Sequence, residues 1–161
     1  MIAIADRINR YAAYLAAAML VVLVMLVVYD ALMRYLFTNG SIALQELEWH
    51  LFDGVILLGI GYTLAKNRHV RVDIFYERFS PRVRMGIDMF GLLFFIIPFS
   101  ALIIYIGWDF VMLSFHQMEA SSNPGGLPYR FIVKALMPLS FVLLALQAFG
   151  EVLRIFKKAR S

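Results

Sequence analysis

Two apolar segments without a charged residue dominate this sequence, and each is long enough to cross a lipid bilayer. The segments Tyr11–Tyr29 and Met89–Trp108 contain 19 and 20 residues. Since an α-helix rises about 1.5 Å per residue, each reaches about 30 Å, the thickness of the hydrocarbon core. Hydrophobic residues make up 62% of the chain and charged residues 16%, whereas soluble domains average about 45–50% and about 25%. These observations predict an integral membrane protein.

Two further segments extend this prediction to four transmembrane helices in a single membrane domain over residues 1–161. The first, Gly54–Ala65, is apolar but short, and it extends back through a polar stretch to Leu44. The second, Ala135–Gly150, extends from Pro128 to Phe156. Pro98 and Pro138 fall inside helices, where we expect kinks. The first helix is expected to be retained, because its apolar run is longer than that of a cleaved signal peptide. The predicted helices lie at about 11–36, 44–65, 81–116 and 128–157.

The distribution of basic residues predicts the orientation of these helices. Of the 15 lysines and arginines, 12 lie in the N-terminal segment, the connector at 66–84 and the C-terminal segment. Arg34, Arg130 and Lys134 are the remaining three, all near helix ends on the opposite side. By the positive-inside rule, we expect both termini to be cytoplasmic. The net charge of +4 is therefore a topology signal, and we expect no nucleic-acid partner.

The connector after the second helix contains an amphipathic stretch. Val72, Phe75, Tyr76 and Phe79 follow the i, i+3, i+4, i+7 spacing of one helix face. This predicts a short interfacial helix at about 71–79, with arginines directed at lipid phosphates; a plain charged loop is the alternative. The residues expected to anchor the chain at the membrane interface are Arg68, Arg71, Arg78, Arg82, Arg84, Trp49 and Trp108.

Ionisable residues near the predicted spans are costly and need an explanation. Asp30 and Arg34 are four residues apart, which favours an intrahelical ion pair or headgroup contacts over a role in transport. Four polar residues cluster at the outer start of the second helix, where contact with Arg34 or with a partner subunit is expected: Glu46, Glu48, His50 and Asp53. Asp53 is the best candidate for a buried polar contact. We expect no charge in the middle of any span, which weighs against an ion path within this chain alone.

Enzymatic and cofactor functions find little support in the sequence. The chain has no cysteine and no nucleotide-binding, metalloprotease or serine-hydrolase motif, so we expect no catalytic residue, cofactor or metal site. His50 and His116 could bracket a haem iron, which leaves a haem-carrying membrane anchor of a respiratory complex as an alternative. A small autonomous multidrug exporter is another, although such exporters usually place a carboxylate deep in the first span and Tyr11–Tyr29 has none.

The order of several motifs resembles the small membrane subunit of tripartite ATP-independent periplasmic (TRAP) transporters, the DctQ-like family. The resemblance covers nearly the whole chain, and the segment His69–Asp73 is its most specific element. The motifs that carry it are Asp30–Phe37, Gln45–Trp49, the glycine-bearing helix with Gly54, Gly59 and Gly61, Arg68–Asp73, and Pro124–Pro128.

This resemblance implies a function that composition does not. It implies a non-enzymatic scaffold for a large, DctM-like membrane subunit that holds the substrate and sodium sites. A periplasmic substrate-binding protein would deliver an organic acid, and the small subunit can add to its docking surface. The resemblance also directs attention to candidate subunit-contact or structural residues, namely Arg34, Glu46, Asp53 and Asp73, and to candidate helix-packing residues, namely Gly54, Gly59 and Gly61.

Overall fold

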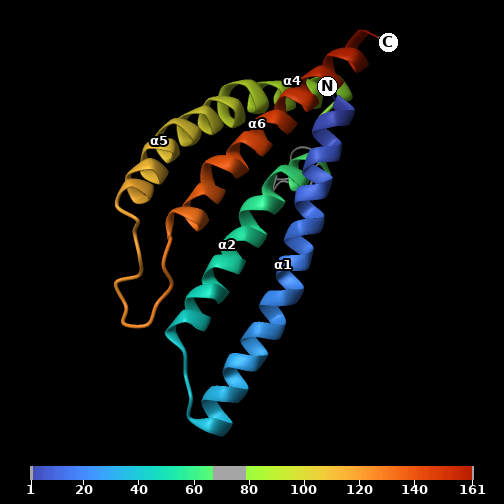
Figure 1. Ribbon diagram of the computed structural model, residues 1–161. Helices are drawn as coiled ribbons and strands as arrows, with labels where there is room; N and C mark the ends of the chain where they lie inside the picture. The colour runs from blue at the N-terminus through green and yellow to red at the C-terminus, as the bar shows by residue number, and fades with distance from the viewer. Residues whose placement is uncertain (1, 67–78, 161) are drawn as a thin grey trace.

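The computed structural model describes residues 2–66 and 79–160, and the regular structure within these ranges is entirely helical (Figure 1). The elements are α1 (Ile2–Phe37), α2 (Ile42–Ala65), α4 (Pro81–Gly91), the π-helical segment η1 (Leu92–Ile96), α5 (Ile97–His116) and α6 (Phe131–Arg160). Because α4, η1 and α5 follow one another without a break, the described residues form four long helices. The all-α prediction is confirmed for the described residues.

Three of these helices are long and apolar enough to cross a membrane. They are Ile2–Phe37, Pro81–His116 and Phe131–Lys158. Helix α2 is not among them, because its first half carries Glu46, Glu48 and Asp53. Asp53 lies at the middle of α2, so the expectation of spans without a central charge is wrong if α2 also crosses the membrane.

The helix ends differ from the predicted ones at two places. Helix α1 begins at Ile2, well before residue 11, and its 36 residues correspond to about 54 Å, more than the hydrocarbon core. The apolar run therefore marks only the middle of a longer helix. Helix α6 begins at Phe131 rather than near Pro128, because Tyr129 adopts a left-handed conformation with φ 60°.

Pro98 explains the π-helical segment inside the third long helix. A proline has no N–H, and its ring clashes with the carbonyl four residues earlier, here that of Phe94. The chain widens at this point, and the Ile97 N–H donates to the carbonyl of Leu92, five residues back. Figure 1 shows α4 and α5 following an arc through this region. Pro138 lies within α6, which continues through it.

Helix α6 is the central element of the bundle. It packs against α1, α2, α4, η1 and α5, while α5 packs against α6 rather than α2 (Figure 1). The apolar core cluster consists of Leu64, Leu92, Leu144, Ala148 and Val152, three of which are α6 residues. Most other large apolar side chains face outward, as expected where lipid replaces water.

The connector between α2 and α4 is described only at its ends. Ser80 is the N-cap residue of α4, and the helix begins at Pro81, in agreement with the predicted start at about 81; the Ser80 hydroxyl makes no capping hydrogen bond. The predicted interfacial helix at about 71–79 lies outside the described residues except for Phe79.

The three glycines of α2 have different surroundings. A Cβ atom at Gly54 would lie 2.2 Å from Met19 Cε, and one at Gly61 would lie 2.0 Å from Asn9 Oδ1, so both glycines allow α1 to approach α2 closely. A Cβ atom at Gly59 would have no neighbour within 4 Å. Gly54 and Gly61 therefore serve packing inside the chain, and Gly59 does not.

We predict that Gly61→Ala lowers the thermal midpoint of the purified protein in detergent by several degrees. Asn9 is held by hydrogen bonds and cannot move away freely, and overpacking of such a contact costs about 1–3 kcal/mol. The matched control is Gly59→Ala, which should leave the midpoint unchanged or slightly higher because alanine favours a helix. Equal effects of the two substitutions would contradict this packing.

Candidate functional site

Glu46 fastens the loop between α5 and α6 to the start of α2. Its side chain is buried, and its carboxylate accepts hydrogen bonds from the Ser121 hydroxyl, from Asn123 Nδ2 at 3.2 Å and from the Leu127 N–H at 2.8 Å. Arg130 Nη2 lies 3.5 Å from Glu46 Oε1 and completes an ion pair. We call these five residues the outer-loop clamp. The expected contact between Glu46 and Arg34 is not formed, because the loop supplies the donors instead.

A glycine is required inside this clamp. A Cβ atom at Gly126 would lie 2.4 Å from Ser121 Cβ and 2.9 Å from Glu46 Oε2. The loop can therefore fold tightly over the carboxylate only with glycine at this position. The Ser121 N–H also donates to the Leu127 carbonyl at 3.0 Å, which closes the loop on itself.

A second ion pair joins the base of the same loop to α6. Lys134 Nζ donates to Glu119 Oε2 and lies 4.2 Å from the ring centroid of Phe110. The Arg130 N–H donates to the Glu119 carbonyl at 2.9 Å. The hydrogen bond from Lys134 lowers the pKa of the Glu119 carboxyl below its ordinary value.

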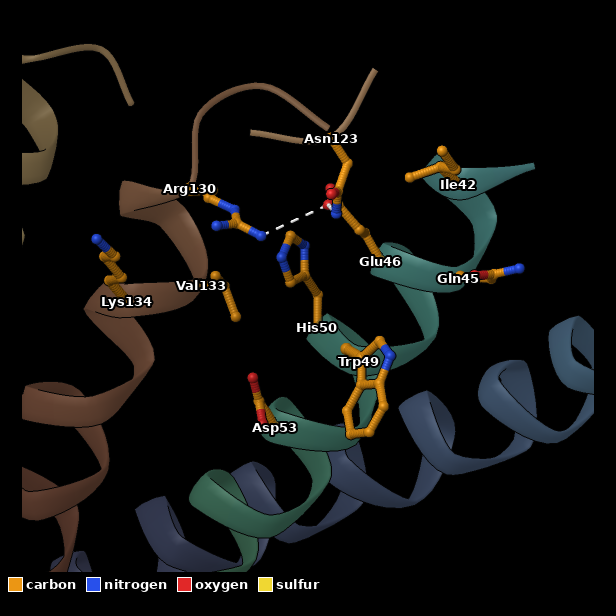
Figure 2. A pocket seen from close by; sticks show the side chains of 10 residues that line it. All are labelled: Ile42, Gln45, Glu46, Trp49, His50, Asp53, Asn123, Arg130, Val133 and Lys134. Atoms are coloured by element: carbon orange, nitrogen blue, oxygen red, sulfur yellow. Dashed lines mark hydrogen bonds and ion pairs between the residues drawn. The ribbon is translucent and has the colours of Figure 1, made fainter. Parts of the chain in front are cut away.

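A cleft of about 430 Å³ lies between α2 and α6 beside the outer-loop clamp (Figure 2). Figure 2 shows Trp49, His50 and Asp53 projecting from α2, with Arg130 and Lys134 on the α6 side. Glu46 and Asn123 line the end that the loop covers. The cleft thus contains acidic, basic and aromatic groups within one small volume.

Asp53 is exposed in this chain, so the buried polar contact expected for it is not formed among the described residues, and contact with a partner subunit stays a prediction. Its carboxylate lines the cleft but forms no hydrogen bond or ion pair with any of the described residues. Both basic residues of the cleft have other partners, since Lys134 pairs with Glu119 and Arg130 with Glu46.

The predicted ion pair between Asp30 and Arg34 is confirmed. Arg34 Nη2 donates to Asp30 Oδ2 one helical turn away, and Asp30 is buried with 1% of its surface exposed. Asp30 Oδ1 and Glu48 Oε1 are both buried without a hydrogen-bond partner in the described structure. Arg34 therefore compensates the charge at the outer ends of α1 and α2.

At the other end of the bundle, Asn9 joins α1 to α6. Its Nδ2 lies 3.0 Å from Gln147 Oε1, 3.3 Å from the Leu143 carbonyl and 3.2 Å from the Ala5 carbonyl. Asn9 and Gln147 are both fully buried. Asn9 Oδ1 has no hydrogen-bond partner and lies against Gly61, where a Cα–H group is the available weak donor.

Four charged or polar residues continue this connection toward the chain ends. Gln147 Nε2 donates to Asp6 Oδ1 at 2.9 Å and to Glu151 Oε1 at 3.0 Å. Arg154 bridges the two carboxylates, with Nη1 2.7 Å from Glu151 Oε1 and Nη2 2.7 Å from Asp6 Oδ2. Together with Asn9, these residues form what we call the terminal polar cluster.

Sequence analysis missed the terminal polar cluster. Its members are spaced by three residues on α1 and by four and three residues on α6, so each set shares one helix face. That spacing was a usable signal for the two stripes. What one sequence could not provide was the pairing of the first helix with the last.

The predicted membrane anchors are only partly described. Trp49 and Trp108 are 67% and 59% exposed. Arg82 and Arg84 lie on α4, and Arg84 Nε donates to the Phe79 carbonyl at 2.9 Å. Four predicted site residues lie outside the described residues, namely Arg68, Arg71, Asp73 and Arg78.

The two histidines considered as haem ligands lie on helices that pack with other partners. His50 lines the cleft on α2, whereas His116 ends α5, which packs against α6. Among residues 2–66 and 79–160, no group of three or more histidine, cysteine or acidic residues could hold a metal ion.

Comparison with known protein families decides between the alternatives. The family model for tripartite ATP-independent periplasmic transporters, DctQ component, matches residues 23–158. The chain belongs to the DctQ family. No curated protein sequence matches it significantly. This DctQ component is thus the small membrane component of a TRAP transporter and not an enzyme.

The family match covers most of the site described above. The outer-loop clamp, the cleft and the α6 half of the terminal polar cluster all lie within residues 23–158 of this DctQ component. Asp6 and Asn9 precede the matched region. The outer-loop clamp therefore falls wholly within the part of the chain that defines the family.

We predict that Glu46→Ala in this DctQ component releases the loop from α2. Amide hydrogen exchange at Leu127 should accelerate about tenfold or more, because hydrogen bonds to a charged acceptor contribute about 1.5–3 kcal/mol. Gln45→Ala, at the neighbouring cleft position, is the matched control and should leave this exchange rate unchanged. Unchanged exchange in Glu46→Ala would rule out the clamp.

The lowered pKa of Glu119 predicts an acid-sensitive contribution to stability. Because the folded-state pKa lies below the ordinary value of 4.5, the ion pair stabilises the DctQ component fully above that value. The contribution is lost as the pH falls through the lowered pKa. The difference in thermal midpoint between the native chain and Glu119→Gln should be constant from pH 8 to pH 6 and shrink below pH 4.5. A difference that grows on acidification would refute the pairing with Lys134.

Proposed function

We propose that this DctQ component is a non-catalytic stator of a sodium-driven transporter that imports an organic acid. In this proposal a large, DctM-like subunit holds the substrate and sodium sites, and a periplasmic binding protein delivers the substrate. The small subunit steadies the large one in the inner membrane while its transport domain moves. The family match supports the partnership, because a DctQ component is one part of a tripartite transporter.

The observation that supports a passive role is the separation of polar groups along the bundle. The outer-loop clamp and the terminal polar cluster lie near opposite ends of α6, at Arg130 and at Gln147–Arg154. Between them, the buried hydroxyls of Ser100 and Ser140 donate to carbonyls of their own helices. An ion path would need a continuous row of polar side chains across the bundle, and the described residues contain no such row.

We further propose four membrane-spanning helices with both termini in the cytoplasm. The basic residues at the chain ends and on α4 support this orientation, and Figure 1 shows both termini at the α4 end of the bundle. Helix α2 then crosses the membrane as well, packed between α1 and α6. In this orientation the outer-loop clamp faces the periplasm, where the binding protein docks.

In this proposal, side chains at both membrane interfaces hold the stator in place. Arg82 and Arg84 on α4, together with the arginines of the preceding connector, contact lipid phosphates on the cytoplasmic side. The exposed rings of Trp49 and Trp108 lie on the opposite side at headgroup level. A chain held at both interfaces resists the lateral load that a moving transport domain imposes.

The proposal is tested by sodium-driven uptake into vesicles that contain either the complete membrane complex or the large subunit alone. We expect uptake of the organic acid to be lost, at least tenfold, without the DctQ component. The thermal midpoint of the large subunit is the control, since it must stay unchanged for the loss to reflect a missing stator rather than unfolding. Equal uptake with and without the small subunit would refute the stator.

A further inference from the structure

Helix α2 presents one outward face that no other helix among residues 2–66 and 79–160 covers. It comprises Trp49, Phe52, Asp53, Ile56, Gly59 and Thr63, which we call the α2 stripe. These positions follow the i, i+3, i+4, i+7 spacing of a single helix face. Trp49, Phe52 and Ile56 are 67%, 47% and 52% exposed, while the other faces of α2 pack against α1 and α6.

The α2 stripe carries an unpaired carboxylate at mid-helix, whereas the exposed carboxylate of Asp109 lies nearer the end of α5. Large apolar and aromatic side chains such as Phe94 and Tyr105 extend outward from η1 and α5, and lipid chains cover such surfaces adequately. Asp53 lies at mid-helix and has no partner in the described structure. Lipid chains cannot neutralise a carboxylate at that depth, so a cation must come from another molecule.

Gly59 is the second unusual feature of the stripe. It lies within the helix, where glycine is less favourable than alanine, and no atom lies near enough to require the absence of a Cβ. A glycine on the outward face lets the backbone of another helix approach closely. An α-helix turns by about 100° per residue, so Asp53 and Gly59 lie about 120° apart, near the two edges of the exposed side of α2.

We propose that a transmembrane helix of the large subunit packs along the α2 stripe and places a lysine or arginine side chain against Asp53. The inference rests on the proposed function and adds the surface and the chemistry of the contact. The cleft of about 430 Å³ beside Asp53 has room for such a side chain (Figure 2). Trp49 lies beside it and offers an aromatic face to the incoming cation.

A second copy of this chain fits the stripe poorly. Two copies inserted with the same orientation would meet through an isologous contact, which brings identical residues together. Their Asp53 carboxylates would then approach each other, and the α2 stripe contains no lysine or arginine to compensate them. Charge complementarity therefore favours a different polypeptide.

Photo-crosslinking tests the surface directly. A photoreactive amino acid replaces Phe52 or Ile56 in the chain co-expressed with the large subunit. Phe94 and Tyr105, which are more exposed than these positions and lie on η1 and α5, serve as controls. We expect adducts with the large subunit from positions 52 and 56, at least fivefold stronger than from positions 94 and 105. Adducts with a second copy of the chain, or with lipid only, would overturn the inference.

Substitution of the carboxylate tests the charge. Asp53→Asn should reduce the amount of large subunit that co-purifies with the tagged chain about tenfold, and Asp53→Glu should restore most of it. Asp109→Asn, which removes an exposed carboxylate from α5, is the matched control. The thermal midpoint of the isolated chain should not change in Asp53→Asn, because Asp53 contacts no described partner.

The outcomes separate this inference from the proposed function. If the unmodified chain fails to retain the large subunit, both are wrong. If it retains the large subunit but Asp53→Asn retains it equally well, the ion pair is wrong and the proposed function stands. The same holds if crosslinks to the large subunit arise from positions 94 and 105 rather than 52 and 56.

Discussion

The cost of an unpaired polar group in a hydrocarbon environment is the constraint on which this structure depends. It requires backbone hydrogen bonds to be satisfied within helices, as the described residues show. It also explains why buried polar side chains gather in connected groups near the helix ends. Glu46 receives four donors in the outer-loop clamp, and Gln147 both accepts and donates in the terminal polar cluster.

Helix α6 takes part in the polar contacts at both ends of the bundle. Arg130 directly precedes it, Lys134 lies in its first turn, and its second half carries three members of the terminal polar cluster. Between these groups lies Leu144, which belongs to the apolar core. Because α6 contacts every other helix of the described structure, displacement of one element strains contacts at both ends. A stator needs this resistance to deformation.

Local features of the structure could be predicted from the sequence, whereas contacts between distant segments could not. The apolar runs, the breaks between helices and the pair of Asp30 and Arg34 follow from composition and spacing. The contact of Glu46 with the loop was not predicted, because the donors lie some 80 residues away in the sequence. Asp53 is exposed within the chain, so its predicted buried contact stays a prediction for the assembled transporter. The sequence of one chain does not show which side of a helix packs against its neighbours, so it cannot tell an aspartate that faces an internal partner from one that faces outward.

Helix α2 contains three glycines and a mid-helix aspartate, residues that an apolar helix usually avoids. Gly54 and Gly61 would each collide with α1 if they carried a side chain, so their helix-weakening effect is offset by close packing. Gly59 has no such compensation, and Asp53 has no counter-charge within the described chain. Sequences that fold well satisfy most local preferences, and violations without an internal gain mark positions where function imposes another requirement. Both positions lie on the side of α2 that the described helices leave open, Asp53 near one edge and Gly59 near the other. The helix is therefore best understood as incomplete alone and complete beside a partner.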